Sequence, residues 1–541
     1  MSKKSMKQPQ KAAKPKQTAV PLKQKSSIFS FQLSTAKLPV LVIFFIVTWL
    51  WAAWYYGSVF HVSREYSFWV ADTRIMEYIL SQPYGVLRYI GRAMLQLYKY
   101  PWLGGLLMAL ILTVGSWLVG YCMRLRASWR AIQYLPALIY MAVVTYLGLD
   151  IFFEARTGFI FGIPFLVLVV LCIWAVIIRS FSRKPVPAFI SIPKDETPRQ
   201  NLLQLAVIAA CLAVIIGFDM WQRPYVRVIC GLLKMEYKQD WAGIQELARE
   251  NALMSNRPMA CSYGISLVQT EQIADRLFEI RMDYDSLYVH GIDGRHNNAS
   301  ALYVPEGNYY GGFIESAQHA CMEQQVINGP TVRLLKLQIK CALMREEWEL
   351  ADKYLAVLRQ VPFEGAFCEK YGKMVRHTDL VNADKEMAKI RLTEPLHDSF
   401  ESQYQQPLFM GYNLMLVEGR SSNALINSLI VCLYTKLMPQ FVERLEPLIG
   451  TTPPPVIMDG ILLAENKNPG LSQNFSGSYL RQPQLQSFFQ ANQAYMSDRA
   501  GHAYELFPRY KGYYPYYYFY GNLKATKKGY TSLTSSSSGV N

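Results

Sequence analysis

The chain has 541 residues and a formal net charge of +15, and apolar residues make up 51% of it. Its length allows roughly three or four domains of about 150 residues each. The basic surplus would suit a nucleic-acid-binding protein. It lies, however, in residues 1–37, 124–130 and 179–199, and from residue 223 onward basic and acidic residues are equal at 32 each. We therefore predict no nucleic-acid partner.

The nine cysteines are scattered along the chain without a CxxC pair. A zinc site or a disulfide framework requires regular spacing of such residues. The sequence also contains no Walker loop, GxGxxG, HExxH or GxSxG motif. We therefore expect free, mostly buried cysteines and no cofactor.

Residues 1–37 hold nine lysines, no acidic residue and many Pro, Gln and Ser. Such a segment cannot bury a core, so we expect a disordered cytoplasmic leader. The apolar run that follows, residues 38–60, is too long for the core of a signal peptide. We expect it to remain as a membrane anchor.

Five apolar runs are long enough to cross the ~30 Å hydrocarbon core of a bilayer, or nearly so. They are residues 38–60, 102–122, 131–149, 158–178 and 201–221. With five crossings, the leader and the segments 124–130 and 179–199 share one side, with 17 lysines and arginines against six in the opposite segments. Because segments rich in lysine and arginine stay in the cytoplasm, we place the N-terminus inside and residues 223–520 outside.

The segment between the first two runs, residues 61–100, is broken at Pro83-Tyr84-Gly85 into two helical stretches. In the second stretch, apolar residues recur at helical spacing and cations line a neighbouring stripe. This pattern is typical of a helix in the membrane interface, with its cations toward the lipid headgroups. The apolar residues are Leu87, Ile90, Met94 and Leu97, and the cations are Arg88, Arg92 and Lys99.

Two acidic residues in the same segment suggest an enzymatic alternative. Membrane glycosyltransferases that use lipid-linked sugars carry a catalytic acid on their first outer loop, and Glu65 and Asp72 occupy a comparable place. A carboxylate there can act as a general base or hold a divalent metal. Pairing with arginines explains the same two acids without catalysis, and five spans are fewer than such enzymes use.

From residue 223 the pattern changes to pairs of helices joined by polar turns at 238–240, 345–347 and 497–499. The clearest pair, residues 334–362, resembles a tetratricopeptide unit, with Ala351 at the close-packing position and Pro362 at its end. The resemblance implies a degenerate α-helical repeat domain. Stacked repeats present an extended surface that usually binds peptides or proteins.

The whole layout resembles an uncharacterised family of bacterial multi-pass membrane proteins, found mainly in Bacteroidota, with a helical-repeat tail outside the cytoplasm. The resemblance is carried by Tyr100-Pro101-Trp102-Leu103-Gly104, Asp240-Trp241-Ala242-Gly243-Ile244 and the tyrosine-rich segment 513–520. It implies a location in the inner membrane and no assigned activity.

Other candidate sites lie in the same tail. Glu315, His319 and Glu323 share one helix face, where they would either ligate a metal or form a solvated, ion-paired surface. The loop 290–298, with two histidines and an aspartate, is a second metal candidate. The tyrosines of residues 513–520 would either stack on sugars or close the end of the repeats. Residues 521–541, with four consecutive serines, are expected to be disordered.

We therefore predict an all-α protein with a five-span transmembrane bundle, residues 38–222, and a tetratricopeptide-like domain, residues 223–520. The predicted function is that of a scaffold, in contact with the lipid bilayer, that recruits protein partners in envelope assembly or export. The alternative is a transferase that acts on a lipid-linked sugar through Glu65 or Asp72.

Overall fold

The computed structural model describes most of the chain between residues 39 and 532. The described ranges are 39–125, 127–152, 156–181, 198–252, 256–280, 288–290, 296–394, 422–434, 436–521, 523–526 and 529–532. The predicted leader, residues 1–37, and residues 291–295 of the predicted polar loop lie outside them.

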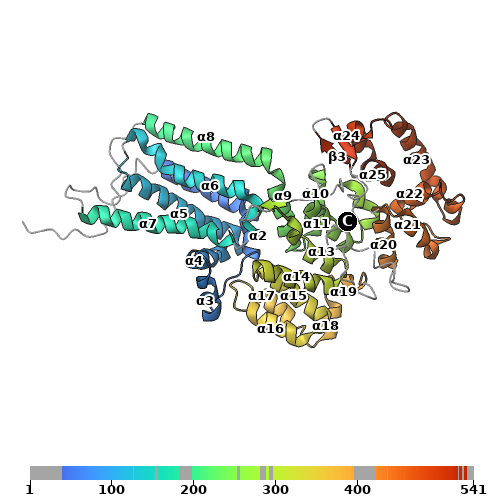
Figure 1. Cartoon of the computed structure of the whole chain (residues 1–541), viewed down its shortest axis with the longest axis horizontal. Helices are drawn as coiled ribbons and strands as arrows, with labels where there is room; N and C mark the ends of the chain where they lie inside the picture. Colours follow the sequence, from blue (N-terminus) through green and yellow to red (C-terminus); the bar gives the residue numbers. More distant parts are fainter. Residues whose placement is uncertain are drawn as a thin grey trace, which may run out of the picture.

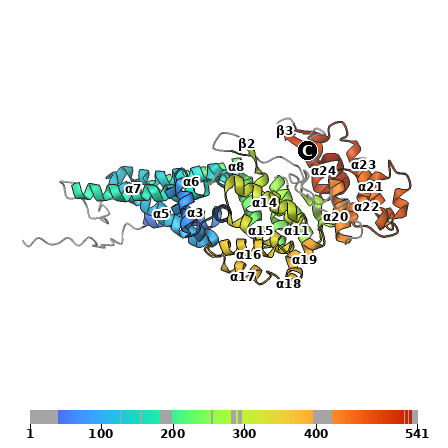
Figure 2. The ribbon, with the colours of Figure 1, turned by 60° about the horizontal axis from the view of Figure 1, so that its bottom comes forward.

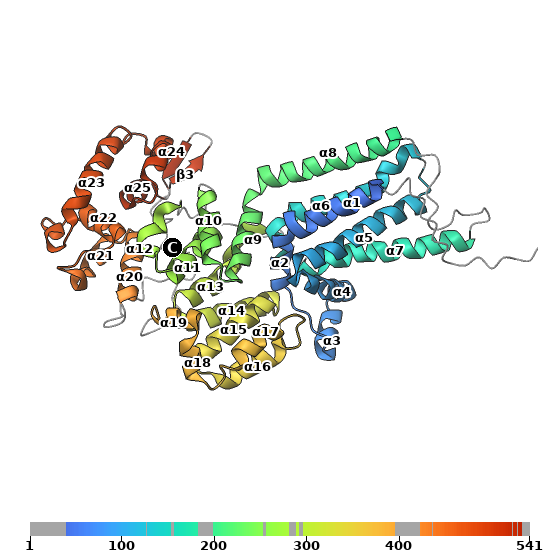
Figure 3. The same cartoon turned by 180° about the vertical axis from the view of Figure 1, so that it is seen from behind.

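Residues 39–222, called the bundle below, form the helices at one end of the elongated molecule (Figure 1). The elements are α1 Pro39–Leu50, η1 Trp51–Tyr55, α2 Gly57–Glu65, α3 Thr73–Ser81, α4 Gly85–Leu95, η2 Gln96–Lys99, α5 Pro101–Cys122, η3 Ala127–Tyr134, α6 Leu135–Leu147, η4 Gly148–Phe152, η5 Arg156–Gly158, α7 Phe159–Phe181 and α8 Pro198–Gln222. Helix α5 packs against α1, α6 and α7. Helix α8 lies beside α6 and α1, on the side away from α7 (Figure 3).

Four stretches of the bundle are long and apolar enough to cross a membrane: Pro101–Cys122, Trp129–Phe152, Arg156–Phe181 and Pro198–Gln222. The first predicted span differs, because its helix bends by 58° between Tyr55 and Gly57. A π-helical turn precedes the bend, and Tyr56 leaves the α-helical region with φ −107° and ψ 5°. The buried ring of Tyr56 stacks on Trp51 at 5.6 Å between centroids, which supports the bent conformation.

Helix α4 packs on the start of α7 through glycines. A Cβ atom at Gly91 would lie 1.8 Å from the carbonyl oxygen of Gly158 and 2.8 Å from the amide nitrogen of Gly162. The cations of the predicted stripe, which lie on α4 and η2, have different neighbours instead of facing one way. Arg92 lines a small cavity together with residues from beyond position 300, and Lys99 pairs with Glu364, which also lies there.

Replacing Gly91 with alanine is expected to destabilise the packing of α4 on α7. The added methyl group overlaps backbone atoms that cannot rotate away, and overpacking of this kind costs about 1–3 kcal/mol. The matched control is Gly115→Ala on α5, because a Cβ atom there meets no atom within 4 Å. Thermal unfolding of the detergent-solubilised protein should show a lower midpoint for the first variant only. Equal midpoints would contradict the close packing.

Residues 223–521 are called the tail below, and its described residues are mostly helical. The elements are α9 Pro224–Glu236, α10 Trp241–Glu250, α11 Arg257–Gln269, α12 Ile273–Arg276, η7 Leu277–Glu279, β1 Tyr288–His290, β2 His296–Asn298, η8 Ala299–Leu302, α13 Val304–Tyr310, α14 Ile314–Asn328, α15 Val332–Met344, α16 Trp348–Leu358, α17 Gly365–Gly372, α18 Thr378–Ala383, α19 Lys385–Arg391, α20 Ser422–Tyr434, α21 Met438–Glu443, η11 Glu446–Leu448, α22 Pro455–Ala464, η12 Leu471–Asn474, α23 Ser478–Gln493, α24 Arg499–Tyr510 and α25 Tyr514–Tyr520. The all-α class predicted for the chain is confirmed.

Four helix pairs of the tail share one turn geometry. In α9/α10, α11/α12, α15/α16 and α20/α21, one turn residue adopts a left-handed φ of 58–61°. The next amide bonds back to the carbonyl five residues earlier, as Asp240 does to Met235 at 2.9 Å and Glu347 to Ala342 at 2.8 Å. This is the hydrogen bond of a Schellman motif. The helix pairs predicted around 238–240 and 345–347 are present, as is the pair α23/α24 around 497–499.

One apolar core runs without a break from the bundle into the tail as far as Ile390. A second core joins α9–α12 to α20–α22 and α25. Figure 2 accordingly shows the bundle, α9–α19 and α20–α25 in a row. Within these cores the six cysteines of the tail are buried, and all nine cysteines of the chain are free, as predicted.

The tyrosine-rich segment closes the second core. Tyr514 and Tyr517 are buried, and their hydroxyls donate to the carbonyls of Leu433 and Tyr434 on α20 at 3.0 and 2.8 Å. Within residues 521–541, for which we expected disorder, the structure describes two short segments, β3 Leu523–Thr526 and β4 Gly529–Ser532. They pair as an antiparallel hairpin, because their backbone groups bond to each other in register.

Candidate functional site

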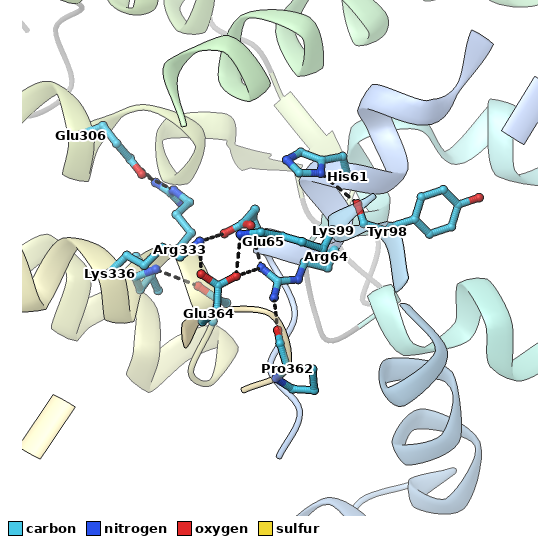
Figure 4. A network of polar contacts seen from close by, with 12 residues as sticks. His61, Arg64, Glu65, Tyr98, Lys99, Glu306, Arg333, Lys336, Pro362 and Glu364 are labelled. Atoms are coloured by element: carbon cyan, nitrogen blue, oxygen red, sulfur yellow. Dashed lines mark hydrogen bonds and ion pairs between the residues drawn. The ribbon is translucent and has the colours of Figure 1, made fainter. Parts of the chain in front are cut away.

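Glu65, the first acid of the enzymatic alternative, lies where the bundle meets the tail (Figure 4). It is the last residue of α2 and is 2% exposed. Its Oε1 accepts a hydrogen bond from Nη1 of Arg64 at 2.7 Å, and its Oε2 accepts one from Nζ of Lys336 at 3.0 Å. Both carboxylate oxygens of Glu65 are therefore engaged by cations.

Glu364, just before α17, is the second acid at this place and is 1% exposed. It pairs with Arg64, and it lies 2.9 Å from Nζ of both Lys99 and Lys336. Nη2 of Arg64 also donates to the carbonyl of Pro362 at 2.8 Å. We call these side chains the junction cluster, which consists of Arg64, Glu65, Lys99, Lys336 and Glu364.

The junction cluster carries three cations against two acids. Burial by itself raises the pKa of Glu364, but Lys336, Arg64 and Lys99 reverse that effect and hold the pKa below its ordinary value. A buried charge costs several kcal/mol to desolvate, so such a group is stable only when each member keeps its partners. The arrangement is that of a structural attachment between α2 and the tail.

A backbone hydrogen bond and a cation–π contact lie beside the junction cluster. The amide of Val332 donates to the carbonyl of Ser67 at 3.1 Å. The guanidinium of Arg333 lies 4.7 Å from the ring centroid of Tyr66. These contacts and the ion pairs together join α2 to α15.

Asp72, the second acid of the enzymatic alternative, caps helix α3. Its Oδ1 accepts hydrogen bonds from the amides of Arg74 at 2.9 Å and Ile75 at 3.3 Å. An N-terminal cap of this kind satisfies amides that have no partner within the helix. The structure does not bring Asp72 into the junction cluster, so the two proposed catalytic acids do not form one site.

The predicted metal ligands of α14 do not converge either. Glu315 pairs with Arg345 at 2.5 Å, whereas His319 lies 3.9 Å from Glu323 on an exposed face. Within the described ranges, no group of three or more His, Cys, Asp and Glu side chains is arranged to hold a metal. The ion-paired surface is thus the arrangement found on α14. The side chains of the loop 290–298 lie outside the described residues.

A second buried acidic group lies deeper in the tail. The two carboxylate oxygens of Glu306 on α13 accept hydrogen bonds from Nε and Nη2 of Arg333 on α15. Nearby, Glu236 on α9 is 3% exposed, and its Oε2 accepts a hydrogen bond from Ser262 at 3.1 Å. Its Oε1 has no hydrogen-bond partner among the described residues.

Burial, together with the charge of Glu306, raises the pKa of Glu236 to about 8. The hydrogen bond from Ser262 and the cations Arg333 and Lys340 oppose this rise without cancelling it. The buried environment of Glu236 therefore favours its protonated form. Strongly raised pKa values are found both at functional sites and in structural networks.

A protein-family model matches residues 32–221 and 156–521 of the chain, which is more than half of its length. The chain belongs to this family, DUF6057. Its description is a family of unknown function. No curated protein and no solved structure matches the chain.

Membership of DUF6057 agrees with the predicted resemblance to an uncharacterised family. The bacterial source and the tetratricopeptide-like character of the tail stay predictions. In this DUF6057 protein, reasoning from the sequence did not find the junction cluster, because its members lie far apart along the chain. Arg64 and Glu364, for example, are 300 residues apart. The one local signal is the adjacent pair Arg64-Glu65, which directly follows a long apolar run.

Proposed function

We propose that this protein is a multi-pass inner-membrane protein of bacteria that holds a helical-repeat scaffold outside the cytoplasm. There the tail recruits a protein partner in envelope assembly or export. In this proposal the bent pair α1 and α2 counts as one crossing, so that the bundle crosses the membrane five times. The excess of lysine and arginine in residues 1–37, 124–130 and 179–199 supports a cytoplasmic N-terminus.

The observation that carries the proposal is the junction cluster. Domains of one chain usually move relative to each other unless their interface is large and well packed. Here a buried ion-pair group and a continuous apolar core join α2 to α15. A tail attached in this way presents its surface at a constant position relative to the bundle, as a scaffold requires.

The transferase alternative requires a carboxylate that is free to reach a substrate. Both oxygens of Glu65 are engaged by cations, and Asp72 caps a helix. The geometry therefore favours the scaffold.

A candidate contact surface lies at the end of the tail that is farthest from the bundle (Figure 1). Tyr479 and Leu480 at the start of α23 are 69% and 68% exposed, and Ile449 is 55% exposed. Hydrogen bonds from Gly450 to Asn474 and from Ser476 to Thr451, both 2.9 Å, bring Ile449 to this place. Exposed apolar side chains that gather in one patch mark surfaces for other proteins.

The partner is tested by site-specific photo-crosslinking in intact cells. A photoreactive residue at Leu480 should yield one discrete protein adduct. The same residue at Gln486, which is exposed on the same helix, should yield none. Tyr479→Asp should abolish the adduct while the protein remains in the membrane. Equal labelling at the two positions, or no adduct at either, would contradict the proposed contact surface.

The orientation is tested separately with a reporter that is active only outside the cytoplasm. We expect activity for a fusion after residue 222 and none for a fusion within residues 182–197. The reverse result would place the tail in the cytoplasm and overturn the proposed envelope role.

A further inference from the structure

A long apolar groove lies between three helices of the bundle. Its floor is α5, and its walls are α6 and α7, which both pack on α5. The groove has a volume of about 400 Å³, within the range of about 300–1,000 Å³ that is typical of ligand sites. Its rim consists of Ile139 and Val143 on α6 and Ile163 and Val167 on α7, all exposed. It therefore opens sideways, toward the bilayer of the proposed topology.

The floor of the groove is open because of a glycine. A Cβ atom at Gly115 would meet no atom within 4 Å, although this residue lies between α6 and α7. The residues of α7 that line the groove run from Phe159 to Leu171, a length of about 18 Å at 1.5 Å per residue. This length is close to the depth of one leaflet, half of the ~30 Å hydrocarbon core.

A proline and a tyrosine allow a hydrogen bond that connects the two walls. Pro164 lies inside α7 and cannot bond to the carbonyl of Ile160, four residues earlier. The hydroxyl of Tyr140 on α6 donates to that carbonyl at 2.5 Å. The hydroxyl of Tyr140 thus supplies, from the other helix, the hydrogen bond that the carbonyl of Ile160 lacks within α7. A carbonyl in an apolar environment needs such a partner because no water is present.

The end of the groove nearest the tail is cationic. Arg156 is part of the lining, and the guanidinium of Arg88 lies 5.2 Å from the ring centroid of Phe159, another lining residue. Arg88 bonds to Gln82 at 3.1 Å, but its buried Nε–H has no partner, and it forms no ion pair with a carboxylate in the described part of the chain. An apolar channel with cations at one end suits a molecule that has a hydrocarbon chain and an anionic head.

We propose that the groove between α5, α6 and α7 binds one acyl chain of an anionic phospholipid, whose phosphate group contacts Arg156 and Arg88. The length of the groove fits the chain, and the charge of its end fits the phosphate. The proposal rests on the membrane insertion argued above, because the lipid enters from the bilayer.

The test is native mass spectrometry of the full-length protein in detergent, with added phosphatidylglycerol or phosphatidylethanolamine of identical chains. The wild type should retain the anionic lipid in preference to the zwitterionic one. Gly115→Leu should lower the retention of both lipids about tenfold, since losing the burial of about two methylene groups changes an equilibrium by that factor. The double variant Arg88→Gln, Arg156→Gln should keep the chain but lose the preference for phosphatidylglycerol.

The matched control is Gly217→Leu on α8, another bundle glycine whose Cβ would meet nothing within 4 Å. It should retain lipid as the wild type does. If Gly115→Leu does not fold, Val167→Trp on the rim formed by α7 is used in its place. If both groove variants retain as much lipid as the wild type, the proposed binding site is wrong. If the arginine variant still prefers phosphatidylglycerol, the proposed contact with the headgroup is wrong. Resistance of the wild type to carbonate extraction from membranes reports on insertion independently of either outcome.

Discussion

Replacing Glu364 with glutamine is expected to lower the free energy of unfolding by about 3–5 kcal/mol, the usual cost of removing one partner from a buried ion-pair group. The substitution leaves Arg64, Lys99 and Lys336 with Glu65 as their only acid within the junction cluster. Three cations, of which Arg64 is fully buried and the two lysines are partly buried, then share a single carboxylate. Because the cluster joins bundle and tail, we expect the tail to loosen from the bundle, which denaturant unfolding and limited proteolysis in detergent would both detect.

The control for this prediction is Glu369→Gln, one turn further along α17. Glu369 also pairs with a lysine, Lys373 at 2.8 Å, but its side chain is 71% exposed. Exposed pairs of this kind contribute little, so the unfolding transition should stay at its wild-type position. Equal effects of the two substitutions would show that burial of the junction cluster does not govern the attachment.

The effect of Glu364→Gln should also depend on pH. The pKa of Glu364 is lowered in the folded protein, so its contribution to stability is present above the pKa of an unfolded glutamate, about 4.3. The contribution is lost as the pH falls through the lower folded value. The difference between wild type and variant should therefore be constant near neutral pH and shrink under strongly acidic conditions.

Replacing Glu236 with glutamine is expected to stabilise the protein at neutral and alkaline pH, by roughly 3–5 kcal/mol. Glutamine has the shape of the protonated acid and cannot ionise. The pKa of Glu236 is raised to about 8 in the folded state. Folding of the wild type therefore takes up a proton, and its stability falls as the pH rises from about 4.3, the ordinary value for glutamate, to about 8.

The measurement is the unfolding midpoint of both proteins across this range. The curves should coincide near pH 4, separate as the pH rises and run parallel above pH 8. Glu246→Gln on α10 is the control, since Glu246 is exposed and its replacement should leave the pH profile unchanged. A variant that is less stable than the wild type at pH 8 would mean that ionised Glu236 has a partner the structure does not show.

The sequence by itself determined the helical class, four of the apolar stretches and the helix pairs of the tail. These features depend on local properties: an uninterrupted apolar run dictates a helix long enough for a bilayer, and an apolar period broken at residues 238–240 dictates a turn. Asp240, the last residue of this turn, caps α10 by accepting a hydrogen bond from the amide of Gly243 at 3.1 Å. Such signals lie within a few residues of one another.

Only the tertiary structure decided what the charged and small residues do. Glu65 has the sequence context of a catalytic acid, but folding brings Lys336 and Glu364 to it from several hundred residues away. The bend at Tyr56 and the open floor at Gly115 depend likewise on neighbours that the local pattern does not reveal. Electrostatic energies change steeply with distance and burial, so a buried ion pair and a free acid can share one local sequence.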